Sequence, residues 1–324
     1  MDKADWLMGG NVFGNTAPIK KEHIKPTLKN FLADLIKVFP KAKNYFNDMK
    51  ALGSVGKKPV SGDIDLALSE KAFENIKDWG LDEKHVQDLF NAFKKRSRSA
   101  TDQQLMKRAV IVAIAEKIED SPNDIAVDVK GSGAGSLFLA YPQYDEEGNK
   151  LDITIKIDIN VGDVDWLSFA YYSASYKGNV KGLHRTQLML TLFVNKGYIF
   201  SHNYGVKNKE TGEIEAQSPG DAIALLNNLY NFNLDQDTLS DYFKLQDYIR
   251  KNLPPEELNN IYDRYLRILD RTRADIPEDL QQYWIDNADR LNLTGKFLPD
   301  DSKLKGTFQP WAESLEEIEY RNKT

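Results

Sequence analysis

The sequence contains no cysteine and only four histidines, at His23, His85, His184 and His202. Without cysteine, disulfides and thiolate zinc sites are excluded, and the scattered histidines form no HExxH pair. No apolar run approaches the ~20 residues of a membrane span, so we expect no membrane partner. The N-terminal stretch MDKADWLMGG is acidic and mixed, unlike a signal peptide, which favours a cytoplasmic protein.

The sequence also has fewer basic than acidic residues. The 43 Lys and Arg are outnumbered by 49 Asp and Glu, which gives a net charge of -6 at pH 7. Proteins that coat nucleic acid non-specifically usually carry a broad basic surface, so this class is disfavoured, whereas a local basic groove is still compatible. One basic cluster stands out, for which a solvated helix end is the favoured interpretation; it consists of Lys94, Lys95, Arg96 and Arg98.

The hydrophobic pattern of the first half predicts helices and then a sheet. Apolar residues at helical spacing predict a helix over 23–38, and two further helices are expected at 82–95 and 101–119, the second capped by Thr101. A short strand should run into Gly53. Further strands, separated by Gly-rich or polar turns, are expected at 64–68, 125–130, 136–141 and 151–161, with a hairpin around Gly148.

The second half is mainly helical. A helix is expected near 183–196 and a hairpin over Tyr198–Gln217 with its turn at KETGE, after which Ser218 and Pro219 mark a helix start. Helices then continue to about 292, with breaks at Pro254 and Pro277. Aromatic residues at helical spacing in this part favour core packing over base stacking; they are Tyr242, Phe243, Tyr248, Tyr262, Tyr265 and Trp284. The fold class is therefore α+β with a helical C-terminal region.

Residues 51–68, ALGSVGKKPVSGDIDLAL, contain the pattern most indicative of chemistry. Residues two apart in a strand point to one face, so Asp63 and Asp65 should project together. Two close carboxylates repel each other unless a cation lies between them, and hard oxygen ligands suit Mg²⁺. Gly53 has no side chain, so backbone amides and the Ser54 hydroxyl could approach a triphosphate.

A third carboxylate is expected on a later strand, because two-metal phosphoryl transfer needs a bridging cluster of such groups. In ITIKIDI, residues 153–159, the isoleucines share one face, while Thr154, Lys156 and Asp158 share the other. Asp158 is therefore the leading candidate. Asp152, Asp163 and Asp165 are weaker candidates because they fall at strand ends or turns.

These residues resemble the polymerase-beta-type nucleotidyltransferase superfamily, whose signature is Gly-Ser, a spacer, Asp-x-Asp and a third Asp on a later strand. SGDIDLAL is similar to the palm motif of the X family of DNA polymerases. The segment 171–175, YYSAS, resembles that family's Tyr-Phe-Thr-Gly-Ser segment. The run 196–206, KGYIFSHNYGV, resembles the start of its thumb hairpin. The resemblance covers roughly residues 48–230.

The resemblance implies a mixed or antiparallel palm sheet flanked by helices, a thumb-like subdomain and a helical C-terminal region. The expected divisions are an N-terminal helical segment 1–46, a palm core 47–175, a thumb-like helix-hairpin-helix region 176–235 and a helical region with tail 236–324. Asp63, Asp65 and Asp158 would bind two Mg²⁺ ions, with Mn²⁺ as the alternative. The nucleotide would be held by Gly53, Ser54, Lys57, Lys58, Ser61, Gly62, Lys156, Tyr171, Tyr172, Ser173, Asn179, His184 and Arg185.

Several functions stay open at this point. The first is addition of nucleotides from a nucleoside triphosphate to a nucleic acid 3′-hydroxyl, on DNA or RNA, with pyrophosphate release. This reading predicts a basic groove near Lys94–Arg98, Lys177 and Lys181. The second keeps the chemistry but uses tRNA, another RNA, a small molecule or a protein as acceptor. A catalytically silent binding module and an α+β protein with a chance motif are the remaining alternatives.

Overall fold

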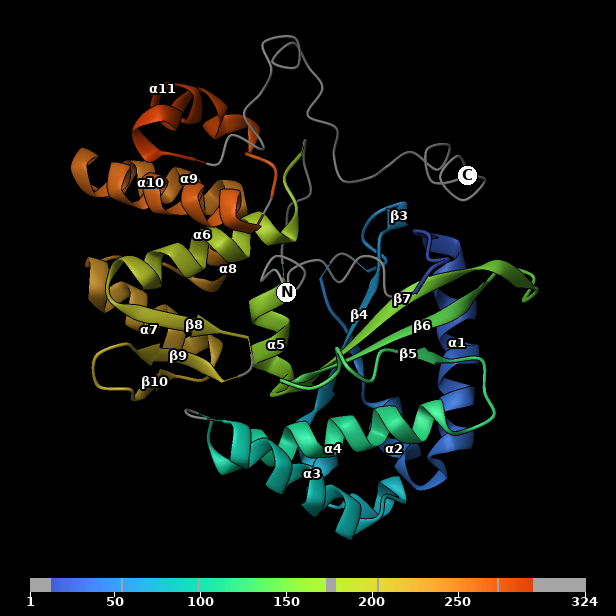
Figure 1. Ribbon diagram of the computed structural model, residues 1–324. Coiled ribbons are helices and arrows are strands. Elements are labelled where there is room, and N and C mark those ends of the chain that lie inside the picture. The colour runs from blue at the N-terminus through green and yellow to red at the C-terminus, as the bar shows by residue number, and fades with distance from the viewer. Residues whose placement is uncertain are drawn as a thin grey trace. The chain divides into compact units, whose positions relative to one another are not determined.

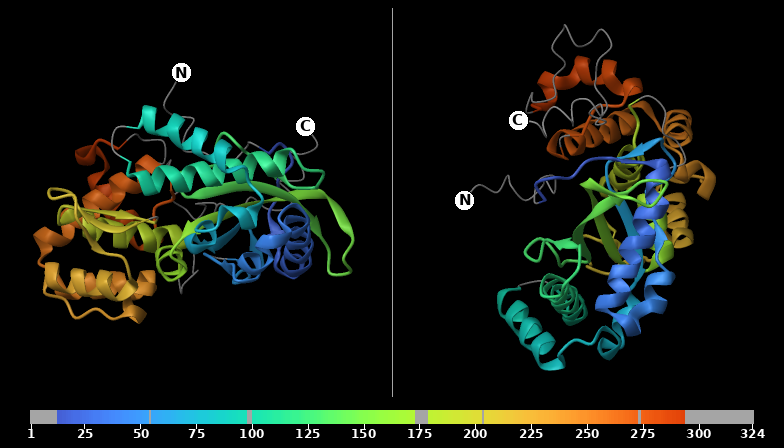
Figure 2. Two further views of the ribbon diagram at one scale, coloured as in Figure 1. Left: turned by 90° about the horizontal axis from the view of Figure 1, so that it is seen from below. Right: turned by 90° about the vertical axis from the view of Figure 1, so that its right-hand side faces the viewer.

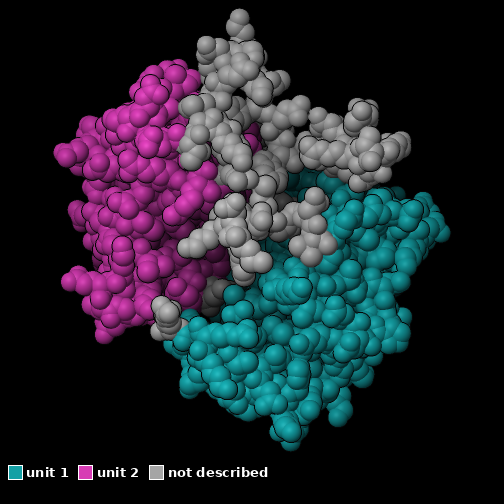
Figure 3. Space-filling model, in the orientation of Figure 1, with its two compact units in different colours: residues 1–167, 318–324 teal, residues 168–317 magenta. Residues whose placement is uncertain are grey.

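The computed structural model describes residues 13–53, 55–97, 100–172, 179–202, 204–272 and 274–293. The chain separates into two compact units, which are coloured separately in Figure 3. Unit 1 comprises residues 1–167 and 318–324, and unit 2 comprises residues 168–317. The α+β class expected from the sequence is confirmed, since helices and a mixed sheet share unit 1.

Unit 1 is built on a five-stranded sheet in the order β2-β4-β7-β6-β5 (Figure 1). The pair β4–β7 is parallel, and the other neighbouring pairs are antiparallel. A small two-stranded sheet joins β1 to β3. The strands are β1 (Ile19–Lys20), β2 (Lys50–Ala51), β3 (Val60–Ser61), β4 (Ile64–Ser69), β5 (Ala126–Val127), β6 (Ser136–Tyr144) and β7 (Lys150–Gly162).

Helices cover one face of this sheet. Residues of α1 and α4 pack against the apolar side chains of β4, β6 and β7, while α3 and α4 lie side by side as an antiparallel pair (Figures 1 and 2). The expected Thr101 cap is present as a capping box with Gln104. The helical elements are α1 (Lys21–Val38), η2 (Pro40–Ala42), α2 (Lys43–Asn47), η3 (Glu70–Phe73), η4 (Ile76–Trp79), α3 (Glu83–Arg96) and α4 (Asp102–Glu119).

Two turns of unit 1 set the ends of β5, β6 and β7. Gly148, with φ of +84°, lies in the hairpin between β6 and β7, as expected. The strand expected at 125–130 is shorter than predicted, because Asp128 starts a turn in which its carboxylate accepts the Gly131 amide and its carbonyl accepts the Ser132 amide.

Unit 2 contains a three-stranded antiparallel sheet, β10-β9-β8, and most of the C-terminal helices. One hairpin was expected over Tyr198–Gln217, but the chain reverses twice. Gly205 permits the extra turn, because its φ is +100° and a Cβ there would lie 2.0 Å from the Ala216 carbonyl oxygen. The strands are β8 (Tyr198–Ser201), β9 (Gly205–Asn208) and β10 (Ile214–Ala216).

The helices of unit 2 follow the predicted breaks at Pro254 and Pro277, and Ser218 caps α7 through the Asp221 amide. Tyr242, Tyr262, Tyr265 and Trp284 are buried, which confirms the core interpretation for these four aromatics. The helical elements, with α5 beginning in unit 1, are α5 (Val164–Tyr171), α6 (Gly182–Asn195), α7 (Pro219–Tyr230), α8 (Gln236–Ser240), α9 (Tyr242–Asn252), α10 (Pro255–Thr272), η5 (Glu278–Leu280) and α11 (Gln281–Leu291). Over the described residues, every helix is too short or too polar to cross a bilayer.

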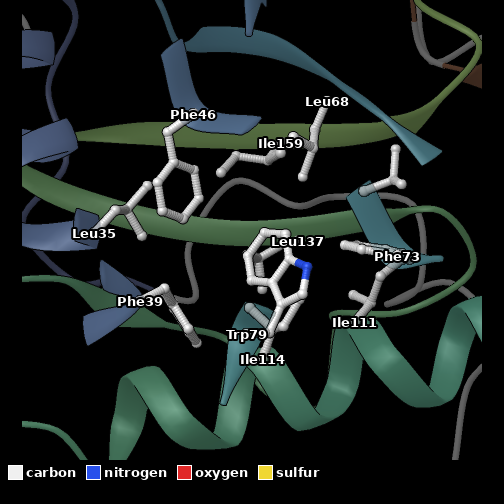
Figure 4. A pocket seen from close by; sticks show the side chains of 11 residues that line it. Leu35, Phe39, Phe46, Leu68, Phe73, Trp79, Ile111, Ile114, Leu137 and Ile159 are labelled. Carbon is white, nitrogen blue, oxygen red and sulfur yellow. The ribbon is translucent and has the colours of Figure 1, made fainter. Parts of the chain in front are cut away.

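The core of unit 1 closes around Trp79. Its ring meets the edges of Phe39, Phe46 and Phe73 at 5.3 to 5.5 Å, and its Nε1–H donates to the Ala72 carbonyl at 2.7 Å. Figure 4 shows Trp79 in an apolar pocket lined by α1, α4 and the sheet. This pocket contains no polar lining group among its side chains apart from the satisfied indole N–H, so we assign it to the core rather than to a ligand.

We expect Trp79→Ala to lower the free energy of unfolding by about 3–5 kcal/mol, because it leaves a cavity among three aromatic rings. Trp79→Phe should cost less, about 1–3 kcal/mol, since it chiefly leaves the Ala72 carbonyl without its donor. Urea denaturation followed by circular dichroism measures both. Equal losses for the two variants would contradict the assigned packing role of the ring.

Candidate active site

Two carboxylates meet on neighbouring strands because of the register between β4 and β7. Asp65 pairs with Asp158 and Ile64 pairs with Ile157. The isoleucines are fully buried on the helix-covered face, so alternation turns both aspartates to the opposite face. Asp63 immediately precedes β4, and its charge acts on both Asp65 and Asp158. The three carboxylates selected from the sequence therefore lie at neighbouring positions on β4 and β7 or directly beside β4.

The environment of these carboxylates disfavours their charged forms. Burial, followed by the charges of Asp63 and Asp158, raises the pKa of Asp65 to about 8. Burial also raises the pKa of Asp158, which is 8% exposed. Its Oδ1 has no hydrogen-bond partner among the described residues, so this buried oxygen is one that a cation or a protein-bound proton would satisfy.

Lys156 partly compensates this negative charge. Its Nζ donates to Asp158 Oδ2 at 2.8 Å and lies 5.4 Å from the centre of the Phe138 ring. Burial alone would lower the pKa of Lys156, but the nearby carboxylates, led by Asp158, raise it. The expectation that Lys156 and Asp158 share one face of the strand is confirmed.

The turn after β2 lies against the Asp65 carboxylate. The Leu52 amide donates to the Asp65 carbonyl at 2.8 Å, which extends the pairing between the two strands. Gly53 then adopts φ of +59°, and a Cβ at this position would be 3.7 Å from Asp65 Oδ2. A Cβ here would make ordinary van der Waals contact with the carboxylate, so the Gly53 turn borders Asp65 at this point. Ser54 lies outside the described residues.

The basic loop leads from this turn to Asp63. Lys57 is exposed, and Lys58 is half-buried, which lowers its pKa. Ser61 is buried in β3, and its Oγ has no hydrogen-bond partner within the described parts of the chain. Gly62 is exposed and directly precedes Asp63. The order of the loop thus puts both lysines between the Gly53 turn and the first carboxylate.

Asn160 belongs to the same polar face but was not selected from the sequence. It is 5% exposed, and its Oδ1 accepts a hydrogen bond from Ser136 Oγ at 2.9 Å. The side-chain amide of Asn160 lowers the pKa of Asp65, but burial and the neighbouring carboxylates raise it more. The available signal was its place two residues after Asp158, because the polar face of ITIKIDIN continues to Asn160.

The remaining sequence-predicted nucleotide contacts fall in unit 2. The Tyr171 ring lies 4.6 Å from the His202 ring, and burial, then the Arg185 charge, lowers the pKa of His202 to about 4. Tyr172 is 39% exposed. Ser173 lies outside the described residues. Tyr172 is thus the more exposed of the two predicted aromatic contacts.

Three other predicted contacts are buried and bonded within unit 2. Asn179 donates to the Ile276 carbonyl, His184 contacts the Asp275 carbonyl through Nε2, and Arg185 donates to the Leu239 and Phe169 carbonyls. These contacts are with the main chain of distant segments. They support a structural role for Asn179, His184 and Arg185 and leave little polar surface for a nucleotide.

Two of the lysines predicted to line a basic groove form ion pairs with aspartates. Lys94 pairs with Asp102 at 2.7 Å, and Lys181 pairs with Asp275 at 3.1 Å. Arg98 and Lys177 fall outside the described residues. Lys95 and Arg96 remain exposed at the end of α3. The cluster 94–96 therefore fits the solvated helix end that the sequence favoured.

A cation would have to draw the carboxylates together. Over the described residues, no three acidic or histidine side chains already form a metal-binding group. The fit of a hard cation is supported by the partnerless Asp158 Oδ1 and by the unfavourable charge of Asp65 beside Asp63 and Asp158. The donor set consists of oxygen atoms, as Mg²⁺ requires.

Comparisons with known proteins give a distant match. No protein-family model and no curated protein matches the sequence. Among solved structures, the chain is similar to polymerase beta from Leishmania infantum in a ternary P/T complex and in a ternary gap complex. Each match has 12% identity and a TM-score of 0.36 and covers 68% of this chain, with 75% and 69% of the respective polymerase chain. Functional conclusions must therefore come from the site itself.

The raised pKa of Asp65 predicts how pH acts on stability. A folded-state pKa of about 8 lies above the unfolded value near 3.8, so the folded protein binds the extra proton and loses stability as pH rises between these values. Asp65→Asn should remove this loss and raise the melting temperature by roughly 5 °C at pH 8.5 without divalent cations. Thermal melts at pH 4 and pH 8.5 test this, and an equal difference at both pH values would contradict it.

Proposed function

We propose that this protein is a metal-dependent nucleotidyltransferase. The observation that carries the proposal is the pairing of Asp65 with Asp158 on parallel strands, with Asp63 adjacent and the Gly53 turn against Asp65. Carboxylates on one face, a close main-chain turn and a lysine-bearing loop match the needs of a triphosphate with its cations. On this proposal unit 1 is a palm-like core and unit 2 holds the thumb-like part.

The reaction would be in-line attack of an acceptor hydroxyl on the α-phosphorus of a nucleoside triphosphate. A new bond forms between the hydroxyl oxygen and this phosphorus, the bond to the α,β-bridging oxygen breaks, and pyrophosphate leaves. Asp63, Asp65 and Asp158 would hold two Mg²⁺ ions. Bound there, Mg²⁺ supplies neutralisation of the charge that builds up on the phosphate oxygens.

Asp158 is the residue proposed to receive the hydroxyl proton. Burial has raised its pKa, which makes the carboxylate a better base at neutral pH. Lys156 donates to Oδ2, so Oδ1 is the oxygen available for the proton or for a cation. Lys57 and Lys58, together with the Gly53 turn, would hold the β- and γ-phosphates.

A nucleic acid 3′-hydroxyl is the acceptor we favour, in a DNA polymerase X-like reaction. An RNA end such as tRNA, a small molecule or a protein hydroxyl is the alternative. The net charge of -6, together with the ion pairs of Lys94 and Lys181 with Asp102 and Asp275, disfavours an acceptor that binds over a broad basic surface.

The proposal predicts loss of transfer on removal of the carboxylates. With labelled dNTPs and NTPs, Mg²⁺ and primer–template DNA, single-stranded DNA or tRNA, Asp63→Ala/Asp65→Ala and Asp158→Ala should each reduce incorporation by at least roughly 10³-fold. Asp152→Ala is the matched control, because Asp152 is an exposed carboxylate on the same strand.

The acceptor that is extended identifies the reaction. Template-directed extension supports the polymerase reading, while transfer to RNA or single strands alone supports the second acceptor class. Retention of transfer in both aspartate variants would disprove the assigned site. Absence of transfer to every acceptor, together with absence of Mg²⁺-dependent triphosphate binding, would leave a binding module.

A second prediction concerns the lysine loop. Lys57→Ala/Lys58→Ala should raise the KM for the triphosphate by roughly 10-fold with little change in kcat. The reason is that each lysine would bind the phosphates equally strongly in the ground state and in the transition state. Steady-state kinetics at saturating acceptor measures this. Lys50→Ala, an exposed lysine on β2, is the control, and an equal rise in KM there would refute a specific role for the loop.

A further inference from the structure

The Asn160 side chain lies between two neighbours on the polar face of the sheet. The register places Ser136 of β6 opposite it on one side and Ala67 of β4 opposite it on the other. Asp65 is two residues before Ala67, so it is the diagonal neighbour of Asn160 on the same face. Asn160 is thus within side-chain reach of a proposed metal ligand.

The Ser136 hydroxyl fixes the direction of the Asn160 amide. Ser136 Oγ donates to Asn160 Oδ1 at 2.9 Å, which holds the amide oxygen toward β6. The amide nitrogen is on the other side of the same planar group, so it faces β4, the strand of Asp65.

Ala67 leaves the space that the amide needs. It is fully buried and has only a methyl group between Asn160 and the main chain of β4. A longer side chain here would stand between the amide and the Asp65 carboxylate. The Gly53 turn borders Asp65 from the β2 side, and the register places Asn160 diagonally beside it on the β7 side.

We propose that Asn160, oriented by Ser136, is a positioning residue that fixes the Asp65 carboxylate in the rotamer that presents its oxygens to the cation. The inference rests on the proposed function and adds to it a three-residue chain across three strands, Ser136–Asn160–Asp65. Groups that hydrogen-bond metal ligands orient them, and their loss typically weakens metal affinity by 10–100-fold.

The test is Mn²⁺ binding, measured by electron paramagnetic resonance with a non-hydrolysable nucleoside triphosphate present. Asn160→Leu should weaken binding by roughly 10–100-fold, since it keeps the volume but removes the donor. Ser136→Ala should act in the same direction with a smaller effect, and Ser136→Thr, which keeps the hydroxyl, should bind as the unsubstituted protein does. The Mg²⁺ concentration for half-maximal transfer should shift in parallel, while the triphosphate KM at saturating Mg²⁺ stays nearly constant.

Thr154→Val is the matched control, because Thr154 is on the same strand and donates to the Asn15 carbonyl at 2.7 Å, away from Asp65. The double variant Ser136→Ala/Asn160→Leu should bind no more weakly than Asn160→Leu alone, because Ser136 acts through Asn160. Circular dichroism checks folding, and if Asn160→Leu does not fold, the comparison of Ser136→Ala with Ser136→Thr decides.

Unchanged Mn²⁺ binding in a folded Asn160→Leu variant would overturn the inference while leaving the proposed function in place. If Asn160→Leu does not fold, unchanged Mn²⁺ binding in Ser136→Ala would do the same. Transfer that survives in Asp63→Ala/Asp65→Ala would instead overturn the proposed function. A lack of Mn²⁺ binding by the unsubstituted protein would overturn both, so the failures are distinguishable.

Discussion

The parallel pairing of β4 with β7 is the constraint on which the candidate site depends. Ile64, Ile157 and their neighbours must be buried under α1 and α4, and alternation along a strand then turns Asp65 and Asp158 to the opposite face of the sheet. A shift of one residue in this register would turn the carboxylates into the apolar core and the isoleucines to the opposite face. The burial of the core therefore fixes the chemistry of the opposite face.

Local patterns explain which parts of this arrangement were predictable. SGDIDLAL and ITIKIDI are alternating segments, so the shared face of Lys156 and Asp158 followed from their spacing alone. The exact opposition of Asp65 and Asp158 did not follow, because the register between distant strands is set by three-dimensional packing. Asn160 was overlooked because an amide is not a metal ligand of the expected kind, and its meaning depends on Ser136 of another strand.

In unit 2, three residues selected through resemblance to a family are buried. Asn179, His184 and Arg185 follow the segment 171–175, which resembles the family's Tyr-Phe-Thr-Gly-Ser segment. Their side chains instead bond to the main chain at Ile276, Asp275 and Leu239. Such partners lie far away in sequence, so neither spacing nor residue type could have distinguished a ligand contact from an internal support. The fold class and the helix boundaries, which depend on local periodicity and caps, were far easier to predict.

The parallel arrangement of β4 and β7 also has a consequence for how the protein is made. Parallel neighbours cannot be joined by a tight turn, and here the crossover holds α3, α4 and two further strands between Asp65 and Asp158. The first two carboxylates leave the ribosome long before the third, and closure of so long a loop is entropically costly and slow. A nascent or truncated chain that ends before β7 thus carries the SGDIDLAL segment but no assembled carboxylate cluster.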